Sequence, residues 1–310
     1  MEISAVTSSS SSTSAVGAYY RENGYVIAEK LVAASLIDDL LDAYRREILP
    51  SKSKFYRQNT NRYEANVITE HGYVANCFLD IHSYRRFDAL RRASLEILFH
   101  PSILAALNNI TGFDDHNLMQ SMLFDANTAT PPHQDWWYLD SVPGGNLLAA
   151  WIALEDIHEA AGRFYVIPKS QTVNLHTAGN KSLSHSEWLK RVQQYCEENN
   201  SRLLAPAMKK GDVLFWNSRT VHGALPTKDG KFSRKSLTAH YLPSHMAFGN
   251  LFTEKDWINY HSYNEHRYFA NQPEYSMKAM LISRVKQTLY DHPVALKLAR
   301  KLQRHSISDI

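Results

Sequence analysis

Two kinds of hydrophobic pattern follow each other along the chain, and the first of them predicts helices. Residues 24–27 form a short apolar run that is typical of a strand. Over residues 36–44 apolar side chains recur at helical spacing, which predicts a helix with Ser35 as its N-cap. A second helical pattern covers residues 87–110. It should break and restart at Pro101, because proline fits only the first turn of a helix.

The second pattern predicts strands. From about residue 118 to 243, short runs of apolar, aromatic and β-branched residues are separated by Gly, Pro, Asn and Asp. Strands at such spacing are typical of a sandwich or barrel. A polar insert at residues 176–201 interrupts them and predicts a surface helix. We therefore expect a mainly β domain with flanking N-terminal helices over residues 20–252.

The C-terminal part of the chain predicts a helical extension over residues 253–310. Residues 276–305 contain seven Lys or Arg and one Asp, together with an apolar stripe. The stripe could pack on the β domain as a lid or buttress, or the basic helix could dock on an anionic membrane surface. We expect packing, with the charges solvated. The stripe consists of Leu281, Val285, Leu289, Leu296, Ala299 and Leu302.

Composition and charge exclude several classes of protein. The hydrophobic fraction is 44% and the charged fraction 21%, which suits a globular protein with a sizeable core. A net charge of +3 is too small to indicate nucleic-acid binding, and no apolar run approaches the roughly 18 residues of a membrane span. The two cysteines, Cys77 and Cys196, lack the spacing of a zinc site or a disulfide framework. The oligomeric state has no signature in the pattern.

The serine-rich segment at residues 1–19 predicts a disordered tail, because serine runs bury too little apolar surface to offset the entropy of ordering. It contains neither a Lys or Arg nor a continuous apolar stretch, and a secretory signal needs both. Together with the few cysteines, this leads us to expect a cytoplasmic protein.

Three residues have the chemistry of a metal site. His133 and Asp135 lie two apart in PPHQDWWY, and on a strand such residues point to the same face. His222 ends the strand pattern GDVLFWNSRTVHG. Two imidazoles and one carboxylate form the facial triad of non-haem iron(II) oxygenases, which leaves three positions open for a chelating 2-oxo acid and dioxygen. A His-x-Asp pair alone arises about once by chance in this composition. The prediction of a metal site therefore depends mainly on the order and spacing of the motifs.

A candidate cosubstrate site follows the third histidine. Arg234 and Ser236 are two apart in SRKSLTAHY, on one face of the next predicted strand. A guanidinium can bind a carboxylate with two parallel hydrogen bonds, and a hydroxyl adds another. The distal carboxylate of 2-oxoglutarate needs such a partner. A surface salt bridge is the plainer role for Arg234.

In combination these motifs resemble the phytanoyl-CoA dioxygenase family of iron(II)- and 2-oxoglutarate-dependent oxygenases, from about residue 20 to 243. The matching stretches are RENGYVIAEKLVAASLIDDL, HQDWW, AWIALEDIHEAAGRFYVIPKS, GDVLFWNSRTVHGALP and SRKSLTAHY. The resemblance implies a double-stranded β-helix (a cupin-like jelly-roll) that uses Fe(II), 2-oxoglutarate and O2, with ascorbate as a supporting reductant. It also implies His133, Asp135 and His222 as iron ligands and Arg234 as the cosubstrate's partner. The sequence departs from the family at residues 169–171, where Lys-Ser-Gln replaces Gly followed by Ser-His.

The resemblance implies hydroxylation of an unactivated C–H bond in a small organic substrate, such as a specialised metabolite. Related halogenases replace the carboxylate ligand with a small residue, whereas this chain keeps Asp135. Alternatives are the same chemistry on a lipid-, CoA- or sugar-linked substrate at a membrane surface, and a catalytically silent metal-binding jelly-roll. A zinc hydrolase with the same ligands would have no use for Arg234.

Candidate substrate residues come from two segments. Trp136, Trp137 and Tyr138 follow the first two ligands directly, so alternate members could line a pocket, although core packing is expected for at least one. Arg57 and Arg62, in the loop FYRQNTNRY, could form a polar lid over an anionic substrate.

Overall fold

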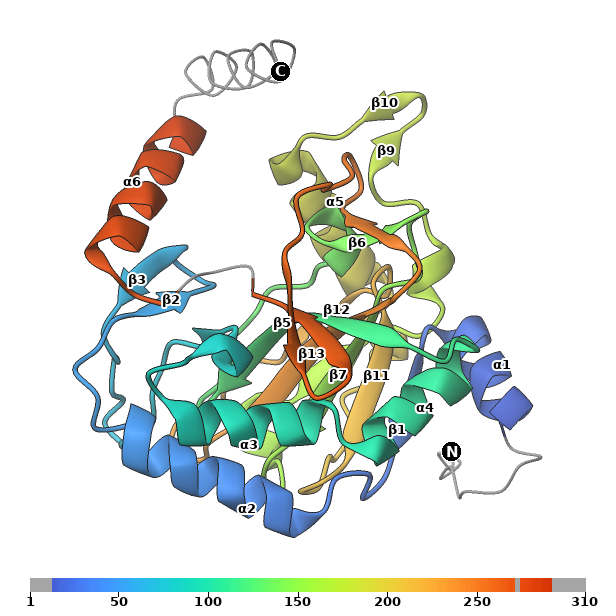
Figure 1. Ribbon diagram of the computed structural model, residues 1–310. Coiled ribbons are helices and arrows are strands. Elements are labelled where there is room, and N and C mark those ends of the chain that lie inside the picture. The colour runs from blue at the N-terminus through green and yellow to red at the C-terminus, as the bar shows by residue number, and fades with distance from the viewer. Residues whose placement is uncertain (1–12, 271–273, 292–310) are drawn as a thin grey trace.

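The fold is a two-layered β structure with helices on one face, and the computed structural model describes residues 13–270 and 274–291 (Figure 1). Eight strands form the main sheet in the order β1-β11-β7-β13-β5-β16-β15, with β4 also paired to β5. Their bounds are β1 (Tyr25–Ala28), β4 (Phe78–Leu79), β5 (His116–Phe124), β7 (Leu148–Ala153), β11 (Val213–Asn217), β13 (Ser236–Pro243), β15 (Tyr260–Tyr263) and β16 (His266–Phe269).

Short two-stranded ladders form the remainder of the β structure and complete a jelly-roll core. They pair β8 (Phe164–Val166) with β12 (His222–Ala224), β6 (Asp140–Val142) with β14 (Ala247–Gly249), β2 (Phe55–Arg57) with β3 (Arg62–Glu64), and β9 (Thr177–Ala178) with β10 (Lys181–Ser182). The helices are α1 (Thr13–Asn23), α2 (Ala34–Ala43), α3 (Asp88–Leu98), α4 (Pro101–Thr111), α5 (His185–Glu198) and α6 (Met277–Asp291). In Figure 1, α2 and α3 run side by side beneath the main sheet.

Strand periodicity separates the two faces of the main sheet. Phe215 and Ile152 lie in the large core that includes residues of α2, α3 and α4, whereas Trp216 and Trp151 lie in a second cluster with Val166 of β8. Successive side chains of a strand point to opposite faces, so both faces of β7 and β11 are buried. The candidate site lies on the face of Trp151 and Trp216, opposite the core that contains α2, α3 and α4.

The hydrophobic pattern predicted some of the N-terminal elements correctly and others not. β1 and the break at Pro101 are confirmed, since α4 begins at that residue. The assignment of Ser35 as an N-cap is wrong: α2 begins at Ala34, its cap position is Ala33, and Ser35 therefore lies inside the first turn. Helix α1 begins at Thr13, within the segment expected to be disordered, and residues 1–12 lie outside the described part of the chain.

The polar insert contains α5, as predicted, but this helix is not confined to the surface. It begins with a capping box between Ser184 and Glu187, and its side chains Trp188, Val192 and Cys196 are buried. An amphipathic pattern with one apolar stripe therefore attaches the insert to the jelly-roll.

The expected helical extension is wrong over residues 260–269, which form strands β15 and β16. Strand β16 pairs with β5, so this segment belongs to the main sheet. Helix α6 follows beside the β2–β3 hairpin, where Tyr275 contacts Tyr63 with ring centroids 5.7 Å apart. Leu281 and Val285, expected to pack, are 62% and 53% exposed. The remaining stripe residues lie outside the described side chains.

Among the described helices, none combines the length and apolar character that a membrane crossing requires.

Candidate active site

A cavity of about 570 Å³ is lined by the three candidate metal ligands and by Arg234, whereas the other candidate cosubstrate residue, Ser236, is fully buried and is not among its lining residues. Its walls come from main-sheet strands β5, β7, β11 and β13, from β8 and β12, and from the turn between β2 and β3. A volume in this range is typical of small-molecule sites, roughly 300–1,000 Å³. His133, Asp135, His222 and Arg234 all line it.

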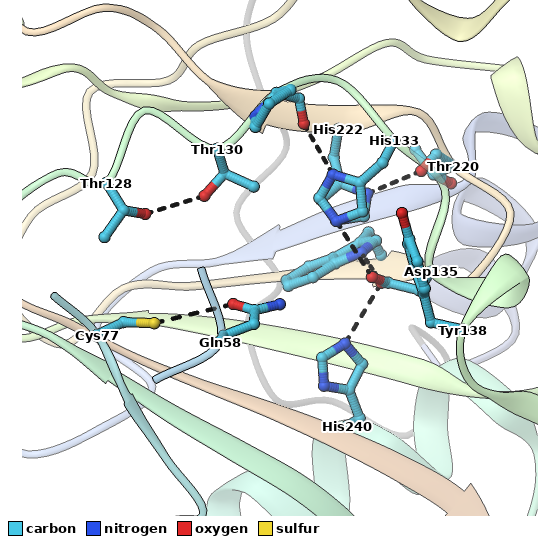
Figure 2. A network of polar contacts seen from close by, with 12 residues as sticks. Gln58, Cys77, Thr128, Thr130, His133, Asp135, Tyr138, Thr220, His222 and His240 are labelled. Carbon is cyan, nitrogen blue, oxygen red and sulfur yellow. Dashed lines mark hydrogen bonds and ion pairs between the residues drawn. The ribbon is translucent and has the colours of Figure 1, made fainter. Parts of the chain in front are cut away.

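The three candidate ligands converge on one point, although they come from distant parts of the chain (Figure 2). The backbones of His133 and His222 exchange two hydrogen bonds of 3.0 Å, which brings their imidazole centroids to 4.2 Å. The Oδ1 atom of Asp135 lies 3.5 Å from the Nε2 atom of each imidazole. Two ligand atoms that are each about 2.1 Å from one ion lie at most about 4.2 Å apart, so these separations fit a shared metal.

The local structure around the ligands differs from the expectation. His133 makes only an isolated bridge, and Asp135 begins a 3-10 turn because the amide of Tyr138 donates back to its carbonyl (2.8 Å). His222 begins strand β12, since β11 ends at Asn217 and the chain turns there. A turn, not a shared strand face, therefore aims the carboxylate at the two histidines.

Both imidazoles present the ring nitrogen that a metal needs. The Nδ1 atom of His133 lies 2.9 Å from the carbonyl of Pro131, and that of His222 lies 2.9 Å from the carbonyl of Thr220. A carbonyl can only accept, so Nδ1 carries the proton and Nε2 presents its lone pair toward Asp135. The fold sets this tautomer before any metal binds.

The electrostatics of the cluster favour an ionised carboxylate. Burial alone would raise the pKa of Asp135, but the positive character of His222 and His240 and hydrogen bonds hold it well below its usual range. Burial lowers the pKa of His222, and Asp135 offsets this only in part. For His133, burial is outweighed by the hydrogen bond and charge of Asp135, and the pKa is raised. Metal binding would have to displace any proton held there.

Two neighbours of Asp135 were missed from the sequence. The indole Nε1 atom of Trp216 donates to Asp135 Oδ2 at 2.8 Å, and His240 Nε2 lies 3.4 Å from the same oxygen. His240 follows Ser236 by four residues on β13 and faces the same side of the sheet. Period-two alternation from Ser236 could therefore have found His240, but nothing local identified its partner.

Arg234 is buried in the cavity wall without an anionic partner among the described residues. It is 2% exposed, and its guanidinium lies 5.3 Å from the ring centroid of Phe124 and 5.9 Å from that of Trp151. Burial lowers the pKa of Arg234 to about 10, so it is still charged at neutral pH. Among the described residues, Arg234 Nε, Trp151 Nε1 and Ser236 Oγ are buried polar atoms without a hydrogen-bond partner. Arg234 and Trp151 both line the cavity, and a buried cation with an unsatisfied donor close by fits a bound carboxylate.

The three aromatic residues after the ligands have different surroundings. Tyr138 lines the cavity, and its hydroxyl lies 2.8 Å from His185 Nε2 on α5. Trp136 lies outside the cavity with the Arg219 guanidinium over its ring at 4.5 Å. Trp137 also lies outside it, stacked on Trp188 at 4.4 Å. Only Tyr138 is therefore placed to meet a substrate.

The expected arginine lid is not formed. Arg57 is fully buried and donates to the carbonyl of Asn76 (3.0 Å) and to Asn66 Oδ1 (2.7 Å), so it anchors the hairpin from below. Arg62 is exposed and does not line the cavity. Three amides from the same loop, Gln58, Asn59 and Asn61, line it instead.

Comparisons with known proteins agree with this geometry. The family model for phytanoyl-CoA dioxygenase (PhyH) matches residues 20–236. Peroxisomal phytanoyl-CoA dioxygenases from Bos taurus and Homo sapiens are each 24% identical to this chain, and the two matches cover 74% and 72% of it. The matches span 68% and 66% of those relatives, so this chain covers about two thirds of their length.

Solved structures share the fold. The epimerase SnoN, in complex with Fe3+, alpha ketoglutarate and nogalamycin RO, has a TM-score of 0.59 at 18% identity, covering 84% of this chain and 99% of SnoN. EctD from S. alaskensis, with 2-oxoglutarate and 5-hydroxyectoine, has a TM-score of 0.56 at 15% identity, covering 82% of this chain and 86% of EctD.

Proposed function

The chain belongs to the phytanoyl-CoA dioxygenase (PhyH) family of iron(II)- and 2-oxoglutarate-dependent dioxygenases, and we propose that it hydroxylates an unactivated C–H bond of a small organic substrate. His133, Asp135 and His222 would hold the iron, and Arg234 with Ser236 would bind the distal carboxylate of 2-oxoglutarate. The observation that carries this proposal is that the three ligands and an unpaired, buried Arg234 line one cavity.

The chemistry of the three candidate ligands fits an iron(II) site. Two imidazole nitrogens and one carboxylate oxygen are the ligands of the facial triad, and no thiolate lies among them. The unsatisfied donors at Arg234, Ser236 and Trp151 would be satisfied by a carboxylate. Hydrolysis at a zinc ion would leave those donors unused, which favours the oxygenase over a zinc hydrolase.

With iron, 2-oxoglutarate and O2 bound, the site supplies an oxidant for a C–H bond and releases succinate and CO2. The protein's own residues bind and orient. Arg234 would supply a fixed positive charge for the cosubstrate. The rings of Phe124 and Trp151 lie next to its guanidinium and help to hold it in place. Asp135 would occupy the coordination position that is vacant in related halogenases, where a small residue replaces the carboxylate. Its presence therefore favours hydroxylation over halogenation.

The cavity walls support a small, partly polar substrate. The amides of Gln58, Asn59 and Asn61 can donate and accept hydrogen bonds, whereas Tyr138 and Phe164 offer aromatic surface. SnoN was solved in complex with nogalamycin RO and EctD with 5-hydroxyectoine, both small organic molecules, which supports the same class of substrate here. A lipid- or CoA-linked substrate remains the alternative to be tested.

Two measurements test the proposal. Anaerobic addition of iron(II) and 2-oxoglutarate should produce the visible charge-transfer band of a 2-oxo acid chelated to iron(II). Succinate release should then be measured with a panel that includes free metabolites, glycosides, acyl-CoA esters and anionic lipid vesicles. We expect stimulation by a free metabolite, whereas stimulation by a glycoside, an acyl-CoA ester or the vesicles would favour the alternative. A folded protein that binds neither iron nor 2-oxoglutarate would contradict the assignment.

A further inference from the structure

The two oxygens of Asp135 have different surroundings. Oδ1 faces the Nε2 atoms of His133 and His222, each 3.5 Å away. Oδ2 accepts a 2.8 Å hydrogen bond from Trp216 Nε1 and lies 3.4 Å from His240 Nε2 (Figure 2). The carboxylate therefore presents one oxygen to the candidate metal position, while the other is engaged by the protein.

The sheet register places Trp216 and His240 together. Trp216 on β11 and His240 on β13 are both register partners of Ala149 on β7, which runs between those strands. Ala149 contributes only a methyl group between the two larger rings, whose centroids are 6.1 Å apart. Trp216 and His240 are each 1% exposed, so neighbouring side chains hold both rings in place.

We propose that Trp216 is a positioning residue that leaves only Oδ1 of Asp135 free to bind the metal. This inference depends on the proposed iron site. Two imidazoles and one carboxylate oxygen leave three positions open, which a chelating 2-oxo acid and dioxygen fill together. If Oδ2 also bound the ion, one of these positions would be lost. The indole N–H disfavours this, because it occupies one lone pair of Oδ2 and holds the carboxylate with Oδ1 toward the two imidazoles.

His240 has a lesser part in the arrangement. Its Nε2 atom is close to Oδ2, but neither ring nitrogen has a hydrogen-bond partner of good geometry among the described residues. His240 therefore closes the space behind Oδ2, and Trp216 provides the directional hydrogen bond. Removal of the Trp216 N–H should consequently have the larger effect on metal binding.

Cobalt(II) provides a test that does not depend on turnover, because its visible absorption reports the number and geometry of its ligands. Wild type, Trp216→Phe and Trp188→Phe are titrated with cobalt(II) alone. Trp188 is the matched control, since it is fully buried and its Nε1 atom has no hydrogen-bond partner among the described residues. We expect Trp216→Phe to alter the cobalt spectrum, because Oδ2 is then free to join the ligands, and Trp188→Phe to preserve it.

A second substitution at Trp216 separates the effect of the N–H group from any effect of a changed ring shape on the fold. Replacing Trp216 by benzothienylalanine, site-specifically, keeps the ring shape and substitutes sulfur for the N–H group. The same spectral change supports the hydrogen bond over simple packing. A wild-type spectrum in the benzothienyl variant overturns the inference. If Asp135→Ala binds cobalt as tightly as wild type, the iron site itself is wrong and both proposals fall.

Discussion

Arg234 and Lys235 are adjacent in the chain, but of the two only Lys235 has a carboxylate partner among the described residues. Its Nζ atom lies 3.2 Å from Asp125 Oδ1 and 3.6 Å from Glu155 Oε2. Successive residues of an extended segment point in opposite directions, so Arg234 turns into the cavity. One cation is neutralised by the protein, and the other is left for a ligand.

This difference makes a matched pair of variants. Arg234→Leu should raise the apparent KM for 2-oxoglutarate at least tenfold, because the loss of a buried charge partner costs about 2–5 kcal/mol. Lys235→Met should leave that KM near the wild-type value, since its side chain pairs with the protein. Succinate formation at varied 2-oxoglutarate concentrations measures both. An unchanged KM for Arg234→Leu would assign the cosubstrate to another residue.

Single replacements of His133, Asp135 or His222 by Ala should abolish succinate formation. Each removes one of the ligand atoms that converge in the structure, and a site with only two protein ligands should hold iron weakly. His158→Ala, at an exposed histidine outside the cavity, is the control and should retain activity. Circular dichroism should show folded protein in all four variants. Wild-type turnover in any triad variant would refute the assignment.

Stability should fall as the pH drops through the range set by two buried histidines. Burial lowers the pKa of His82 to about 4 and that of His116 to about 4, from an unfolded value of 6.5. Between these values the unfolded chain binds protons that the folded chain does not. The associated stability is fully present above about pH 6.5 and is lost toward pH 4, by about 3 kcal/mol for each residue.

Urea denaturation at several pH values measures this loss. In His82→Gln the decline in unfolding free energy between pH 7 and pH 4 should be smaller by about 3 kcal/mol, whatever the variant's stability at pH 7. The physical reason is that the neutral imidazole of His82 is held between Ser121 Oγ (2.6 Å) and the carbonyl of Phe269 (2.9 Å). An identical pH dependence in wild type and variant would show that the pKa of His82 is the same in the folded and the unfolded chain, contrary to the prediction.

The capping box of α5 should contribute measurably to stability. The Ser184 hydroxyl accepts from the Glu187 amide, and the Glu187 carboxylate accepts from the Ser184 amide at 2.8 Å. Ser184→Ala should therefore lower the unfolding free energy by about 1 kcal/mol, as measured by urea denaturation. Ser201→Ala, at an exposed serine beyond the C-terminal end of α5, should change it little. Equal effects of the two substitutions would argue against the cap.

Residue chemistry and short-range periodicity were sufficient for much of this protein. The apolar runs predicted β1 and the restart at Pro101, and the polar insert predicted α5. His133, Asp135 and His222 could be selected because few side chains bind iron(II) and their order along the chain is informative. These inferences depend on propensity and ligand chemistry, which are properties of single residues and of their near neighbours.

The pairing of distant segments was decided only by the tertiary structure. Strands β15 and β16 join the main sheet although they lie within the stretch predicted to be a helical extension, and Arg57 binds backbone carbonyls instead of facing the cavity. The contact of Trp216 with Asp135 likewise depends on a turn meeting a strand far away in the chain. Sheet register and cavity walls are set by which distant surfaces bury each other, and that free energy depends on all the packed partners at once, so no local pattern contains it.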